Sequence, residues 1–101
     1  MFRRGRFSEV IGRQLDLFEL DHGDVIAEAA DKLAAYNRAE RDEAEELYGD
    51  YLDAVETGTE ILADMRDHYA RSLEDPDAYI RDFNRAVERR LPPFALEIEN
   101  R

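Results

Sequence analysis

The fold of this chain is decided by residues 40–73, which read ERDEAEELYGDYLDAVETGTEILADMRDHYARSL and contain no proline. Apolar and small residues recur there in steps of four and three, at Ala44, Tyr48, Tyr51, Val55, Gly58, Leu62, Met65 and Tyr69. This spacing is typical of a helix that packs along its whole length. At 1.5 Å per residue such a helix is about 50 Å long. We therefore predict one long central helix over residues 40–73.

A second helix is predicted before it, over residues 8–37, with Ser8 as a favourable N-cap. Gly23 interrupts the pattern, because glycine in a helix costs about 1 kcal/mol relative to alanine. Two interpretations stay open: one continuous helix, which we favour because the apolar stripe keeps its phase, and two helices that meet near Gly23. A short turn near Asn37 would make the helices 8–37 and 40–73 an antiparallel hairpin.

A shorter third helix is predicted over residues 76–91, because Asp75 and Pro76 form a specific helix start. The last ten residues, 92–101, begin with two prolines and then alternate apolar and charged residues, which is a strand-like period. We expect an extended tail that lies across helices of this chain or of another copy. The fold class is therefore all-α, with residues 1–101 forming a single helical domain that begins with a basic arm over residues 1–7.

Composition narrows the classes of function. The chain has no cysteine, which excludes disulfides, zinc fingers and thiol nucleophiles. The net charge is −11, and residues 40–65 hold ten acids against Arg41 alone. Such a surface repels nucleic acid and anionic membranes and suits a basic protein partner or metal cations. We see neither a membrane span nor a secretory signal, so we expect a cytoplasmic protein. Arginine outnumbers lysine 13 to 1, which we interpret as the mark of a GC-rich bacterial genome.

The apolar stripe near the turn of the hairpin predicts a homodimer. A helix over residues 76–91 is about 24 Å long, which is half the length of the hairpin, so it can cover only one end. A large apolar patch left uncovered usually marks an interface. Pairing of two turn ends would complete a four-helix bundle. The alternative is that the tail folds back over the turn end. The predicted dimer interface consists of Ala29, Leu33, Tyr36, Leu47, Tyr48, Tyr51, Leu52 and Val55.

A metal site is a weaker hypothesis. Glu19 and His22 form a Glu-x-x-His motif, which places both side chains on one side of a helix. This motif resembles half of the pattern in ferritin-like carboxylate bundles. In the hairpin, Glu56 and Glu60 come level with it. The resemblance implies iron, manganese or zinc held by Glu19, His22, Glu56 and Glu60. The simpler interpretation is a histidine at a helix break with its acids in water.

A small-residue gap at Gly58 and Thr59 predicts either close helix approach or a pocket in the bundle core. The residues that would line such a pocket are Phe18, His22, Tyr51, Gly58, Thr59 and Leu62. The sequence has no serine–histidine–aspartate signature and no glycine-rich phosphate loop. We therefore predict no catalytic residues and no cofactor. The favoured hypothesis is a structural or interaction module that is a homodimer; the alternatives are the metal-binding bundle and an acidic mimic that binds a basic protein.

Overall fold

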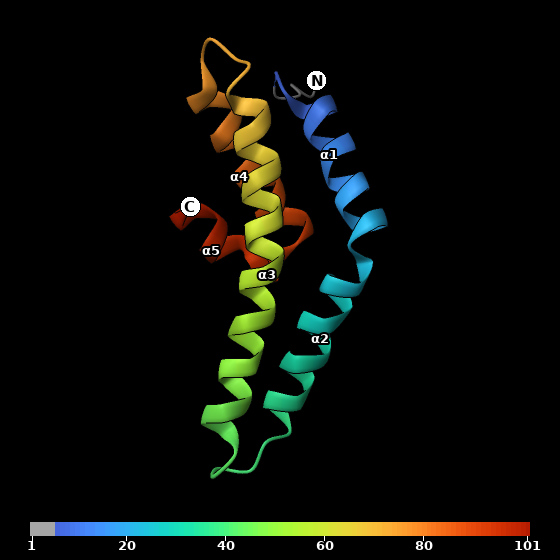
Figure 1. The fold of residues 1–101 in the computed structure, drawn as a ribbon, viewed down its shortest axis with the longest axis vertical. Helices are drawn as coiled ribbons and strands as arrows, with labels where there is room; N and C mark the ends of the chain where they lie inside the picture. Colours follow the sequence, from blue (N-terminus) through green and yellow to red (C-terminus); the bar gives the residue numbers. More distant parts are fainter. Residues whose placement is uncertain (1–5) are drawn as a thin grey trace, which may run out of the picture.

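The computed structural model describes residues 6–101, which fold entirely into helices, turns and loops (Figure 1). The helices in chain order are α1 (Ser8–Asp21), α2 (Gly23–Asn37), α3 (Ala44–Ala70), α4 (Pro76–Arg90), the short 3-10 helix η1 (Pro92–Phe94) and α5 (Ala95–Asn100). The all-α prediction is confirmed, and the helix-start signal at Asp75 and Pro76 does open α4. Residues 1–5 of the predicted basic arm lie outside the described residues. None of the described helices is long and apolar enough to cross a membrane.

The N-terminal helix is divided in two, so the continuous helix 8–37 that we favoured is wrong and the alternative is confirmed. His22 has φ −127° and ψ 32°, and the chain bends there between α1 and α2. The bend loses little hydrogen bonding, because the His22 N–H still donates to the Phe18 carbonyl and the His22 carbonyl accepts from Val25. The interruption is one residue long, which is why the apolar stripe keeps its phase across it.

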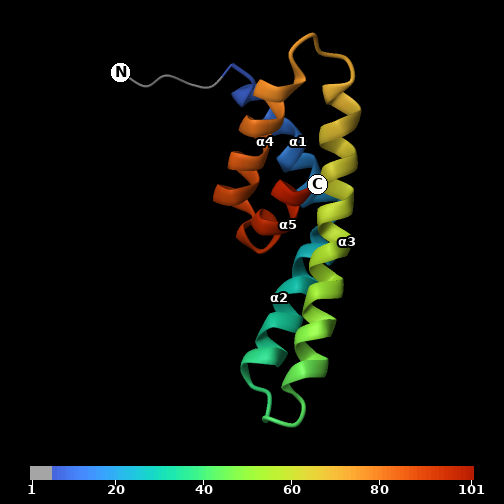
Figure 2. The ribbon, with the colours of Figure 1, turned by 90° about the vertical axis from the view of Figure 1, so that its left-hand side faces the viewer.

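The prediction of an extended tail is also wrong. Residues 92–101 form η1 and then α5, which lie beside α3 and α4 (Figure 2). Phe94 and Ile98 are fully buried, whereas Leu96 is 72% exposed. Phe94 and Ile98 are four residues apart and so lie on one side of a helix, whereas Leu96 lies on the other side. The alternation that suggested a strand therefore fits a helix that buries every second apolar residue. The tail thus packs on this chain, but beside the middle and upper part of α3 and not at the turn end.

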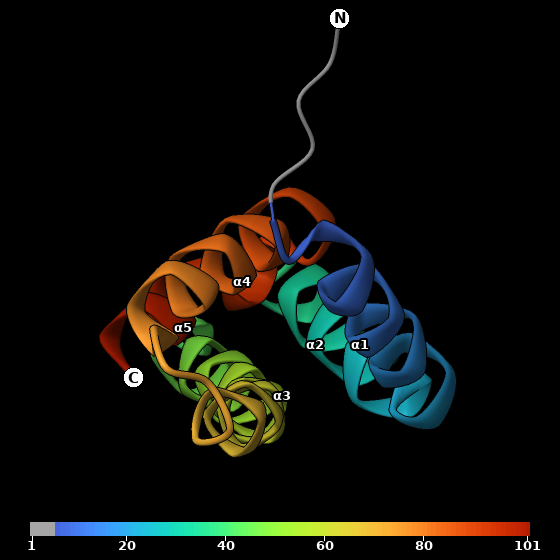
Figure 3. The same cartoon turned by 90° about the horizontal axis from the view of Figure 1, so that it is seen from above.

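Most of the core lies at one end of a molecule that measures 50 × 29 × 22 Å, and Ala29 and Val55 extend it toward the other end. We call the end that holds most of the core the head: α1, residues 58–70 of α3, α4, η1 and α5. Seen from above in Figure 3, α1, α3 and α4 surround it, with α5 between α3 and α4. Its fully buried large side chains are Leu15, Phe18, Leu62, Tyr79, Phe83, Val87, Phe94 and Ile98. Below the head, α2 and residues 44–57 of α3 continue as a two-helix hairpin, which we call the stalk.

Candidate interaction surface

A single stripe along α3 is covered in the head and uncovered in the stalk. Its members are spaced by four and three residues and so share one side of the helix: Tyr48, Leu52, Val55, Thr59, Ala63, Arg66 and Ala70. From Val55 upward every member is buried, because α4, η1 and α5 pack beside this part of α3. Below Val55 the stripe opens to solvent, with Leu52 43% and Tyr48 44% exposed. The stripe thus changes from buried to exposed where the head ends (Figure 2).

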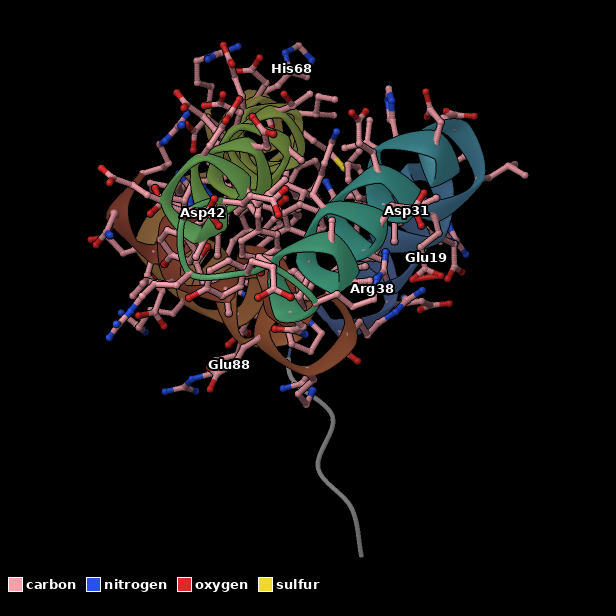
Figure 4. All side chains as sticks on the ribbon, turned by 90° about the horizontal axis from the view of Figure 1, so that it is seen from below. Glu19, Asp31, Arg38, Asp42, His68 and Glu88 are labelled. Carbon is pink, nitrogen blue, oxygen red and sulfur yellow. The ribbon has the colours of Figure 1, made fainter. Side chains whose placement is uncertain are left out.

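The stalk has two unlike faces. The polar face holds a groove of about 310 Å³ lined by Glu28 and Lys32 from α2 and by Asp50 and Asp53 from α3. Residues two positions further along a helix point about 200° away. The opposite face of the stalk, which we call the apolar face, therefore carries Ala30, Ala34 and Leu52, with Leu33 and Tyr48 beside them. Figure 4 shows that α4, which carries Glu88, lies on one side of the stalk and that His68 points to the other.

Three tyrosines form an aromatic cluster near the turn. The ring centroids of Tyr36 and Tyr48 are 5.1 Å apart, and those of Tyr48 and Tyr51 are 6.2 Å apart. None of the three rings is buried. Aromatic side chains are enriched in protein interfaces, because they supply large contact areas and retain a polar group. The cluster is therefore the strongest candidate for a contact with another molecule.

The predicted dimer interface divides into two groups. Leu33, Tyr36, Leu47 and Tyr51 are partly exposed, and Tyr48 and Leu52 are exposed, so these six are available to a partner. Ala29 and Val55 are 1% and 3% exposed. These two must be removed from the predicted interface, because packing within one chain already covers them.

The pocket predicted beside Gly58 is occupied by the C-terminal segment. The ring of Phe94 packs against Gly58, and its centroid lies 6.1 Å from that of Phe18. Phe18, Thr59 and Leu62 are fully buried. The Thr59 hydroxyl donates to the Val55 carbonyl at 2.8 Å, as expected for a threonine inside a helix. The missing side chain at Gly58 therefore makes room for a residue of the same chain.

The four residues of the metal hypothesis do not come together. Among residues 6–101 no group of three or more histidines and carboxylates is arranged to hold a metal ion. Glu19 instead accepts a hydrogen bond from Arg90 at 2.7 Å, and Glu56 lies 3.8 Å from the Arg101 guanidinium. His22 sits at the helix break, with its ring centroid 5.5 Å from that of Phe18.

Two arginines that sequence reasoning missed hold the head together. Arg66 is 2% exposed, yet it donates to the Asp67 carboxylate at 2.8 Å and to the Asn84 side-chain oxygen and the Ile98 carbonyl at 3.0 Å each. It thereby joins α3 to α4 and α5. Its position on the apolar stripe of α3 was the available signal, since an arginine there must find buried acceptors.

Arg90 plays the same part between α4 and α1. It donates to the Asp16 carboxylate at 2.8 Å as well as to Glu19, and it reaches the Gly12 carbonyl at 3.3 Å. Partial burial lowers the pKa of the Arg90 guanidinium, but the hydrogen bonds to Asp16 and Glu19 outweigh it and raise the pKa above its ordinary value. Arg90 therefore stays charged and is already neutralised within the chain.

Comparisons with protein-family models, with curated proteins and with solved structures find no match for this chain.

Proposed function

We propose that this protein is a structural, protein–protein interaction module that works as a homodimer and has no catalytic activity. The observation that supports this proposal is the α3 stripe, which the head buries above Val55 and leaves open at Leu52 and Tyr48. The apolar face of the stalk and the aromatic cluster lie together below the head. A second copy that covers this surface would complete a four-helix bundle, in which each stalk supplies two helices.

The solution mass tests the homodimer. The chain has a mass of 11.8 kDa, and at micromolar concentration we expect sedimentation and light scattering to report twice this value. Substitution of Tyr48→Ser together with Leu52→Ser should shift the mass to that of one chain while circular dichroism stays helical. A wild-type protein that remains a monomer at this concentration would overturn the proposal.

The head offers a matched control for these substitutions. Leu17 and Leu20 of α1 are 53% and 79% exposed, and both lie outside the stalk. Replacing both by serine removes at least as much exposed apolar surface as the substitutions at Tyr48 and Leu52. The double variant Leu17→Ser/Leu20→Ser should therefore keep the mass of the wild type, which would tie association to the stalk and not to apolar surface in general.

A basic protein partner is the second candidate, and the polar face of the stalk favours it. Glu28, Asp50 and Asp53 line one groove, and none of them forms an ion pair within residues 6–101. Binding of a lysine-rich peptide that weakens with salt, and that is lost in Asp50→Asn/Asp53→Asn, would support it. The metal-binding alternative stays a prediction; elemental analysis of protein purified without chelator tests it for iron, manganese and zinc.

A further inference from the structure

The head and the stalk together have the shape of a step. The helices α1, α2 and α3 form the long part of the molecule, and α4, η1 and α5 add a second layer over the head alone (Figure 2). This second layer ends at the C-terminus of α4 and at η1, above the stalk. It covers the upper part of the α3 stripe, which continues downward into Leu52 and Tyr48, so it lies on the side of the apolar face. A packed helix is about 10 Å thick. The space below the second layer and beside the stalk is therefore one helix layer deep. A stalk, whose two helices lie side by side, is also one helix layer thick.

The step restricts how two stalks can meet through their apolar faces. In a parallel dimer the two second layers would face each other at the same height and hold the stalks two helix layers apart. In an antiparallel dimer each stalk lies below the partner's second layer, and both apolar faces are covered. We propose that two copies of this chain pair antiparallel, with each stalk filling the step of the other. This inference rests on the proposed homodimer and specifies its geometry.

Charge favours the same arrangement. The turn of the stalk carries three acids, Glu40, Asp42 and Glu43, against two arginines, Arg38 and Arg41. In the antiparallel dimer this turn reaches the C-terminal end of the partner's α4. Arg85 and Arg89 lie at that end, are exposed, and form no ion pair with any other residue of the described chain. The acid at this end of α4 is Glu88. Opposite charges across an interface fix its register. The arrangement thus brings the acidic turn of one copy to unpaired arginines of the other.

Crosslinking tests the geometry directly, because the natural chain has no cysteine. Asp42 and Glu88 are both exposed, one at the turn and the other near the end of α4 (Figure 4). The variants Asp42→Cys and Glu88→Cys are mixed and treated with a short bismaleimide reagent. Antiparallel pairing predicts a linked dimer in the mixture, with the two substituted positions joined, at a yield several-fold above that of either variant alone.

The control is a mixture of Asp42→Cys with His68→Cys, since His68 points away from the side on which α4 lies and should give no linked dimer. If the wild type has the mass of a dimer but Asp42→Cys links to itself as efficiently as to Glu88→Cys, the pairing is not antiparallel. The homodimer would then stand and this inference would fail. If the wild type is a monomer by mass, both fail together.

Discussion

At the scale of single residues, Gly58 is the position where the packing of the head allows no side chain. A Cβ atom on Gly58 would lie 2.8 Å from Cζ of the fully buried Phe94 ring. We expect Gly58→Ala to lower the free energy of unfolding by about 1–3 kcal/mol, because overpacking outweighs the gain of about 1 kcal/mol in helix propensity. Urea unfolding followed by circular dichroism measures this change.

The control for Gly58 is Gly12, which also lies inside a helix but where an added Cβ atom would meet no atom of another element within 4 Å. Gly12→Ala should raise the free energy of unfolding by up to about 1 kcal/mol. If both substitutions stabilised the protein equally, the contact between Gly58 and Phe94 would be contradicted.

Because of Tyr79, the free energy of unfolding should depend on pH in the alkaline range. Its hydroxyl donates to the Gln14 side-chain oxygen at 2.8 Å, and burial raises the pKa of Tyr79 from 10.0 to about 12. Below pH 10 the phenol is neutral in both states and contributes no pH dependence. Between pH 10 and 12 only the unfolded chain ionises, so the folded state should lose about 2 kcal/mol as the pH rises.

Unfolding in urea at about pH 9 and pH 11 measures the first part of this loss, about 1.3 kcal/mol. Tyr79→Phe should remove the part of the alkaline destabilisation that comes from Tyr79. An equal alkaline loss in the wild type and in Tyr79→Phe would show that this phenol is not the titrating group.

At the scale of the elements, Arg66 links α5 to the rest of the head. Replacing it by methionine keeps most of the aliphatic length but leaves the Ile98 carbonyl and the Asn84 oxygen without their donor. We expect Arg66→Met to lower the free energy of unfolding by about 2–4 kcal/mol and to weaken the hydrogen-exchange protection of α5. Arg81→Met, at an exposed arginine of α4, is the control and should change stability by less than about 0.5 kcal/mol.

The elements also show what the sequence could predict. The long helix α3 and the start of α4 follow from local signals, namely an unbroken apolar period and Asp75–Pro76. The tail could not be assigned this way, because over six residues an alternation of apolar and charged residues is compatible with a strand and with a helix. What decides between them is the position of Phe94 against Gly58 and of Ile98 next to Arg66, which are 36 and 32 residues apart in the chain.

The candidate site could be predicted only in part, because it too depends on contacts between distant segments. Periodicity identified the uncovered residues near the turn, of which Tyr48 and Leu52 are exposed in the structure. It could not show that Ala29 and Val55 are already covered, or that Glu19 is bound by Arg90, because both depend on distant segments. The polar and apolar faces of the stalk became distinguishable only once the side that α4 covers was known.

At the scale of the whole molecule, charge reversal tests whether the acidic turn meets the arginine end of α4 in a second copy. Arg85→Glu/Arg89→Glu would place acids against the partner's Asp42 and Glu43. We therefore expect the dissociation constant of the dimer to rise at least about tenfold, which corresponds to about 1.4 kcal/mol. Asp42→Lys/Glu43→Lys should weaken the dimer similarly, by placing lysines against arginines. Sedimentation equilibrium measures both dissociation constants.

The combined variant distinguishes a direct contact from a general effect of net charge. With all four residues reversed, the opposite charges face each other again, so the dissociation constant should return toward that of the wild type. The differences among the variants should shrink at high salt, because exposed charges are then screened. If the two double substitutions weakened the dimer additively and the combined variant were the weakest, the acidic turn and the end of α4 would not be in contact. In that case the step below the head would have to be filled in another way.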